Sequence, residues 1–110
     1  MSNRPDKAQY YSSLFMTLVV NFQTAAWQQM GKIKNPLTDK IERDLEQAKI
    51  SIDMLDMLCE KTKNNLTEDE RKFIERIISE LKLNYVAELN KDKKEAAEKK
   101  QPEPETATQE

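Results

Sequence analysis

A chain of 110 residues suits one small domain, and a formal net charge of -2 argues against a general nucleic-acid binder. The absence of histidine removes the commonest general base and the commonest transition-metal ligand. Cys59 is the single cysteine, so no internal disulfide can form, and its place in the apolar pattern suits a reducing compartment.

Helix breakers are rare along the chain. Its single glycine and its prolines at 5, 36, 102 and 104 leave three long intervals free of them, and the alternation typical of strands is absent. We therefore predict an all-α fold, with helices near residues 9–30, 39–62 and 68–92. They are expected to form a small antiparallel three-helix bundle, or a helical hairpin plus an N-terminal helix, completed by oligomerisation. The predicted organisation is a disordered lead at 1–8, a helical domain at 9–92 and a charged, disordered tail at 93–110.

The first helix carries no charged residue between Ala8 and Met30. Its apolar side chains cover about 240° of the helical wheel, whereas a helix in a monomer needs only a little over 100°. The chain alone should not cover this surface, so a partner is predicted. Gly31 is expected to end the helix in the left-handed conformation, and Pro36 marks a loop.

The apolar run from Leu14 to Val20 also resembles the core of a signal peptide. It is short, however, and no convincing small-residue cleavage site follows it. Thr17, Asn21 and Gln23 interrupt the stretch that a membrane span would require. Export and membrane insertion are therefore disfavoured.

The second helix is expected to begin at a capping box formed by Asp39 and Glu42, with Thr38 as an alternative cap. Its apolar residues recur four and three apart, which predicts a seam against another helix. The seam comprises Ile41, Leu45, Ala48, Ile52, Leu55 and Cys59. A second apolar set lies on the far side and comprises Ile50, Met54, Met57 and Leu58. This helix therefore needs cover on two sides.

A tight turn should separate the second helix from the third. Asn64 or Asn65 can adopt the left-handed conformation that ends helices, and Thr67 with Glu70 forms a capping box for the next one. The third helix shows an ordinary apolar arc of about 160°. That arc comprises Phe73, Ile74, Ile77, Ile78, Leu81, Tyr85 and Leu89.

Candidate chemistry is sparse. Asp53, Asp56 and Glu60 share a helix face and could hold a hard cation, but a solvated acidic strip is the preferred interpretation. Cys59 lacks an activating base and falls on the apolar seam, which favours a packing role. We predict no catalytic, cofactor-binding or metal-binding residue and no small-molecule substrate. Acidic residues interleave the lysines of residues 91–100, which favours a solubilising extension over nucleic-acid binding.

Because of this excess apolar surface, we expect a non-enzymatic interaction protein. It either self-assembles or binds a partner helix as an adaptor. The predicted interface comprises Met16, Val19, Val20, Trp27, Met30, Ile50, Met54 and Met57. A peripheral membrane module using the uncharged first helix is the alternative. It is disfavoured because the polar strip from Ser13 to Gln28 offers no lysine or arginine.

The chain resembles the small bacterial family known as domain of unknown function 1844 over about residues 15–86. The segments that carry the resemblance are Met30-Gly31, Asn35-Pro36, Ile52-Asp-Met-Leu55, Glu60-Lys-Thr62 and Asn65-Leu-Thr67, within the longer stretch from Ala48 to Glu70. Asn64 stands where the family usually has glycine, and asparagine tolerates the left-handed conformation there. The resemblance implies a short, cytoplasmic, all-helical bacterial protein and implies no activity.

Overall fold

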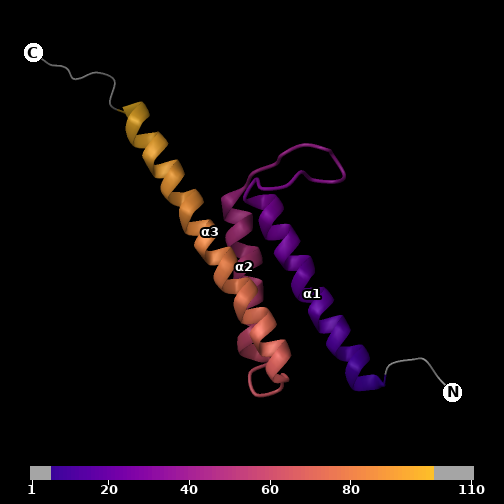
Figure 1. Cartoon of the computed structure of the whole chain (residues 1–110). Helices are drawn as coiled ribbons and strands as arrows, with labels where there is room; N and C mark the ends of the chain where they lie inside the picture. The colour runs from indigo at the N-terminus through magenta and orange to yellow at the C-terminus, as the bar shows by residue number, and fades with distance from the viewer. Residues whose placement is uncertain (1–5, 101–110) are drawn as a thin grey trace, which may run out of the picture.

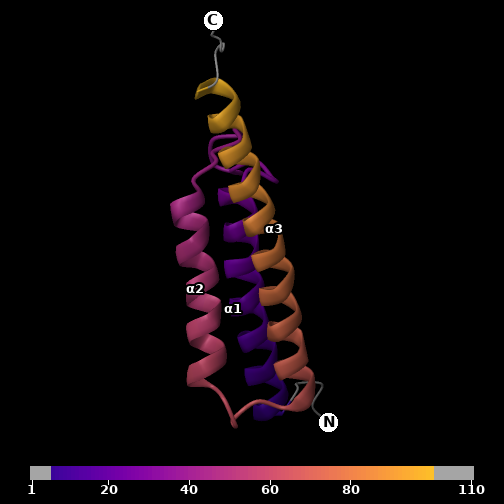
Figure 2. The ribbon, with the colours of Figure 1, turned by 90° about the vertical axis from the view of Figure 1, so that its left-hand side faces the viewer.

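Residues 6–100 form three helices in a computed structural model, and these residues are the ones described below. The helices are α1 (Lys7–Gln29), α2 (Leu45–Lys61) and α3 (Glu68–Lys100). They run up, down and up, so α1 and α3 are parallel and α2 is antiparallel to both (Figures 1 and 2). The described part of the chain contains no strand, only one isolated bridge between Asn35 and Lys40, which confirms the predicted all-α fold.

Local interactions define both ends of α1: a side-chain cap at its start and a glycine in the left-handed conformation after its end. Asp6 caps the helix by accepting a 2.8 Å hydrogen bond from the Gln9 N–H, and the Gln9 side chain accepts from the Asp6 N–H, so α1 begins at Lys7. Gly31 follows with φ 82°, as expected for a left-handed cap. A Cβ at this position would lie 3.1 Å from Cδ of Arg43, so the glycine also allows that side chain to pack closely.

The second helix begins later than predicted, because its N-cap is Asp44 and not Asp39. Asp44 Oδ1 accepts a 3.2 Å hydrogen bond from the Gln47 N–H, whereas Asp39 lies in the loop with φ 58°. Asn35 organises that loop and donates a 2.7 Å hydrogen bond to Glu42, the residue predicted to complete the Asp39 capping box. Ile41 was predicted to be part of the apolar seam, but it precedes the helix and is 52% exposed.

The turn between α2 and α3 follows the prediction. Asn64 has φ 71°, the left-handed conformation. The Thr67 N–H donates to Glu70 Oε1 at 2.8 Å, and the Glu70 N–H donates to Thr67 Oγ1 at 3.1 Å. This reciprocal pair is the predicted capping box, and it directs the chain back along α2 as α3.

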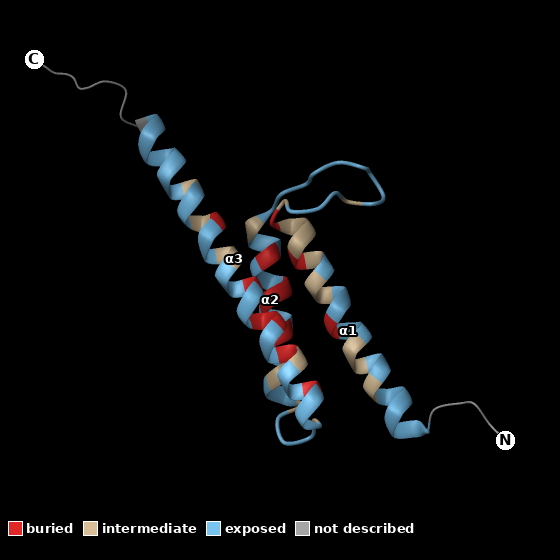
Figure 3. Ribbon diagram, viewed as in Figure 1, coloured by how far each residue is buried: buried red, intermediate tan, exposed pale blue. Residues whose placement is uncertain are grey.

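The core lies where the three helices meet (Figure 3). It contains Val19, Ala26, Met30, Ala48, Ile52, Leu55, Ile74, Ile77, Ile78 and Leu81. The α2 seam is confirmed at Ala48, Ile52 and Leu55, while Leu45 and Cys59 are half-buried at its ends. A fully buried side chain of the Leu or Ile class contributes about 1.5–3 kcal/mol, so this one cluster supplies the main stabilising term.

The third helix is longer than expected and continues past residue 92 to Lys100. Residues 93–99 are exposed, and this end of α3 extends beyond the ends of α1 and α2 (Figures 1 and 2). Residues 93–100 are therefore helical here, where the sequence predicted a disordered tail. The rest of that tail, and residues 1–5 of the predicted lead, lie outside the described residues.

Candidate interaction surface

The first helix leaves several large apolar side chains exposed. Among its own residues only Val19 and Ala26 are fully buried. Five large apolar side chains in the first 14 residues of α1 remain exposed, namely Tyr10, Tyr11, Leu14, Leu18 and Val20. Figure 3 shows the resulting exposure along the N-terminal half of α1. Covering these side chains would remove substantial apolar area from water.

The second helix exposes a shorter stripe formed by Ile50, Met54 and Met57. These residues are spaced four and three apart, so they share one face of α2. All three lie off the Ala48–Ile52–Leu55 seam. The α2 stripe, as we name these three residues, is therefore surface that the chain itself leaves open.

A polar contact shows how the two helices face each other. The Ser51 hydroxyl of α2 lies 2.7 Å from the side-chain amide of Gln29 in α1. Around α1, Leu18 lies about 20° from Gln29, and around α2, Met54 lies about 60° from Ser51. Both residues therefore lie toward the α1–α2 seam of their helices. We name Tyr11, Leu14, Leu18 and the α2 stripe the α1–α2 face.

The predicted interface residues separate into three groups. Val20, Ile50, Met54 and Met57 are exposed, whereas Met16 and Trp27 are half-buried. Val19 and Met30 are fully buried in the chain's own core instead of presenting a surface to a partner. They lie there because α2 and α3 cover their side of α1. The set also omitted Tyr11, Leu14 and Leu18, since apolar residues flank the uncharged polar strip on both sides and the sequence does not show which of these sides points outward.

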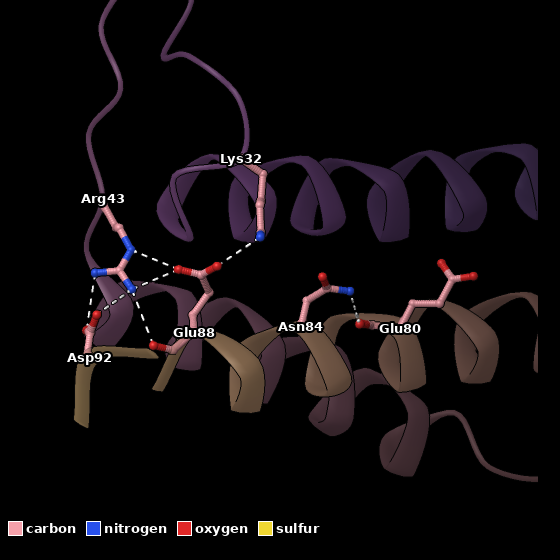
Figure 4. Close-up of polar contacts among 6 residues, drawn as sticks. All are labelled: Lys32, Arg43, Glu80, Asn84, Glu88 and Asp92. Atoms are coloured by element: carbon pink, nitrogen blue, oxygen red, sulfur yellow. Dashed lines mark hydrogen bonds and ion pairs between the residues drawn. The ribbon is translucent and has the colours of Figure 1, made fainter. Parts of the chain in front are cut away.

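Glu88 anchors the connection between α1 and α2 (Figure 4). Its side chain is only 9% exposed and pairs with Lys32 Nζ at 2.8 Å and with Arg43 Nη2 at 2.8 Å. Arg43 Nη2 also lies 2.9 Å from Asp92 Oδ1. These pairs hold both ends of the loop against α3, and we name the four residues the Glu88 cluster.

The cluster also determines the charge state of its members. The hydrogen bond from Lys32, followed by that from Arg43, lowers the pKa of Glu88 below its ordinary value, although burial acts in the opposite direction. The hydrogen bonds to Asp92 and Glu88 raise the pKa of Arg43. Glu88 therefore remains an anion that the two cations need, and the cluster is a structural anchor.

A second buried carboxylate lies at the opposite end of the bundle. Glu70 caps α3, and a hydrogen bond with Ser12 of α1, followed by one with Thr67, lowers its pKa. Ser12 of α1 therefore lies close to the carboxylate that caps α3.

The acidic strip forms ion pairs with neighbouring lysines. Asp53 lies 2.8 Å from Lys49 within α2, and Asp56 lies 2.9 Å from Lys82 of α3. Between residues 6 and 100, no group of three His, Cys, Asp or Glu side chains is arranged to hold a metal ion. In the structure, Asp53 and Asp56 of the strip pair with lysines at the protein surface.

Cys59 is half-buried beside a surface hollow near the α2–α3 turn, which Lys63, Leu66 and Arg71 also line. Burial raises the pKa of the Cys59 thiol, and the nearby carboxylate of Glu75 acts in the same direction. A raised thiol pKa lowers the fraction of thiolate, the reactive form. This environment favours packing over nucleophilic chemistry.

Comparison with known proteins supports the resemblance seen in the sequence. The family model described as Domain of unknown function (DUF1844) matches residues 12–88, more than half of the chain. The chain belongs to this family. In this DUF1844 member the matched range runs from Ser12 in α1 to Glu88 in α3, so it includes all three helices and the loop. No curated protein and no solved structure matches the chain. None of the described helices combines the length and the apolarity that crossing a bilayer requires.

Proposed function

We propose that this DUF1844 chain is a non-enzymatic interaction module that self-associates through the α1–α2 face. The observation that supports this most directly is the exposure of Tyr11, Leu14 and Leu18 on α1 together with that of Met54 on the neighbouring helix. Single exposed apolar residues are ordinary on protein surfaces, but a set of them on two adjacent helices favours an interaction site.

A second copy of the chain is the partner that best suits the charge of this face. No charged residue occurs between Ala8 and Met30, so two α1 helices can meet without repulsion and without burying an unpaired charge. The polar strip of α1 contains hydroxyl and amide groups that can both donate and accept hydrogen bonds. Its members are Ser13, Thr17, Asn21, Thr24 and Gln28. Such a surface is compatible with itself, as an isologous interface requires.

Stable self-association needs several side chains of the face at once. At about 1.5 Å per residue, the 23 residues of α1 extend about 34 Å. Covering the exposed part of one half-buried Leu or Met contributes about 1 kcal/mol. Association costs on the order of 4–15 kcal/mol in lost freedom, so stable pairing needs most of the face and not one residue.

Charge substitutions on the face test the proposal. Replacing Leu18→Asp together with Met54→Asp puts two carboxylates where two copies would meet, so self-association should weaken at least tenfold. Leu83→Asp is the matched control, because Leu83 is 75% exposed on α3, away from the face. Sedimentation velocity across a concentration series measures the association, and circular dichroism verifies that each variant remains helical. Equal association in both variants would show that the α1–α2 face does not mediate self-association.

A lipid surface is the competing occupant of α1, and flotation with vesicles separates the two. The polar strip of α1 has no lysine or arginine to contact headgroups, which favours the protein partner. We expect the chain to remain at the bottom of the gradient with phosphatidylcholine–phosphatidylglycerol vesicles. Flotation that Leu18→Asp abolishes would favour the lipid-contacting module instead.

A further inference from the structure

The loop between α1 and α2 exposes aliphatic side chains that the proposed function leaves unexplained. Leu37 is 93% exposed, and Ile33 and Ile41 are 42% and 52% exposed. Aliphatic residues in a polar loop have no neighbouring helix to cover them. Their exposure indicates a contact surface.

The loop has a defined shape, and Asn35 organises it. The Asn35 N–H donates to the Lys40 carbonyl at 2.8 Å, while the Asn35 carbonyl accepts from the Asp39 N–H at 2.7 Å. Asn35 Oδ1 accepts from the Leu37 N–H at 2.8 Å, and Asn35 Nδ2 donates to Glu42. The Glu88 cluster fixes both ends through Lys32 and Arg43. A preorganised loop has less conformational freedom to lose when it binds.

The loop and α2 carry opposite charge balances. Residues 32–43 contain four basic and two acidic side chains, whereas α2 contains four acidic and two basic ones. Lys32 and Arg43 are engaged by Glu88, so Lys34 and Lys40 are the basic groups that face water, and Asp39 lies 3.9 Å from Lys34. Along α2, Asp53 and Glu60 lie at one edge of the α2 stripe, and the pair of Asp53 with Lys49 is itself exposed to water. An aliphatic and basic loop complements an aliphatic stripe edged with acids.

The positions of the two surfaces suit exchange between copies. The loop leaves the end of the bundle where α1 ends and α2 begins, while Met57 and Glu60 lie near the opposite end, close to the α2–α3 turn (Figures 1 and 2). A two-fold axis perpendicular to α1 sets the two α1 helices antiparallel. Each loop then lies beside the end of the other copy that carries Met57 and Glu60.

We propose that the loop of one copy, through Ile33, Leu37 and Ile41, docks on the acid-edged α2 stripe of a second copy. Lys34 and Lys40 face Asp53 and Glu60 across this contact. The inference rests on the proposed self-association and specifies its geometry. An anionic lipid surface could attract the same loop, but Asp39 and Glu42 lie within the loop, and α2 offers both an apolar stripe and acids at its edge.

Charge reversal with rescue tests this contact in the full chain. Lys34→Glu with Lys40→Glu should weaken self-association roughly tenfold, and Asp53→Lys with Glu60→Lys should do the same. Mixing the two variant proteins should restore association between unlike copies, because both loop contacts then join opposite charges, one as in the wild type and one with the signs reversed. Lys93→Glu with Lys94→Glu is the matched control. It makes the same charge change on the exposed end of α3 and should leave the dissociation constant within about twofold.

Each result supports or overturns the contact. Weakening with rescue supports it, as does weakening in Leu37→Ser. Unchanged association in the loop variants overturns the docking while the proposed self-association stands, whereas a monomeric wild type overturns both. Pelleting with phosphatidylcholine–phosphatidylglycerol vesicles that Leu37→Ser abolishes, with self-association unchanged, would assign the loop to lipid and also overturn the docking.

Discussion

Glu88 is the residue on which the position of the loop depends. Its carboxylate is nearly buried and accepts hydrogen bonds from both Lys32 and Arg43. In Glu88→Gln both cations lose a charged partner, so we expect the free energy of unfolding to fall by about 1–3 kcal/mol. Urea denaturation followed by circular dichroism measures the change. Glu80→Gln on the same helix is exposed and should stay within about 0.5 kcal/mol of wild type; an equal loss in both variants would contradict the role of Glu88.

Acid should destabilise the fold through Glu70 and Glu88. Both pKa values are lowered in the folded chain, so between those values and the unfolded value of about 4.3 the unfolded state binds more protons. Their contribution is complete above about pH 5 and is lost as the pH falls through the folded pKa values. Unfolding free energies measured from pH 7 to pH 3 should show this decline, and Glu88→Gln should make it shallower. A variant with an unchanged pH slope would exclude Glu88 as its source.

Residue-scale predictions from the sequence were reliable only where the interaction is local. Gly31, Asn64 and the Thr67–Glu70 box depend on neighbours within a few positions, and all three are confirmed. The Glu88 cluster was missed because Lys32 and Arg43 lie 56 and 45 positions away in sequence. No spacing rule for a single helix connects such residues.

At the scale of elements, the start of α2 shows how competing local signals are decided. Asp39 and Asp44 are both acceptable N-caps by residue type. The Asn35 hydrogen bonds and the Glu88 cluster keep residues 32–43 in a loop, so Asp44 caps the helix. The sequence predicted the existence of α2 but not its first residue, because contacts to α3 decide that boundary.

Paired substitutions distinguish the two caps. Asp44→Ala removes the acceptor for the Gln47 N–H and should lower the free energy of unfolding by about 1 kcal/mol. Asp39→Gly should be neutral or stabilising, since Asp39 has φ 58° and glycine adopts that conformation without strain. Thermal denaturation of both variants measures the difference. A larger loss in Asp39→Gly than in Asp44→Ala would restore the earlier start.

The turn into α3 gives a similar comparison at Asn64. Alanine in the left-handed conformation costs about 1 kcal/mol relative to asparagine or glycine, so Asn64→Ala should destabilise by about that amount. Asn65→Ala is the neighbouring control and should have a smaller effect. Urea titrations give the free energy of unfolding of the two variants. Equal losses would show that the left-handed conformation of Asn64 does not contribute to the stability of the turn.

At the scale of the whole molecule, the bundle buries one side of each helix and leaves the α1–α2 face open. The sequence predicted this imbalance from the apolar arc of α1 and the two apolar sides of α2. It could not assign individual residues, because Val19 and Leu18 are equally apolar and only the packing of α2 and α3 decides which is covered. The excess apolar surface was predictable, whereas its position on the bundle required the structure.

Sedimentation equilibrium of the wild-type chain at micromolar concentration measures whether it self-associates. We expect a molar mass at least twice the 12.9 kDa of one chain, falling toward that value on dilution. A mass of 12.9 kDa throughout, together with no binding of a dye that detects exposed apolar surface, would contradict it.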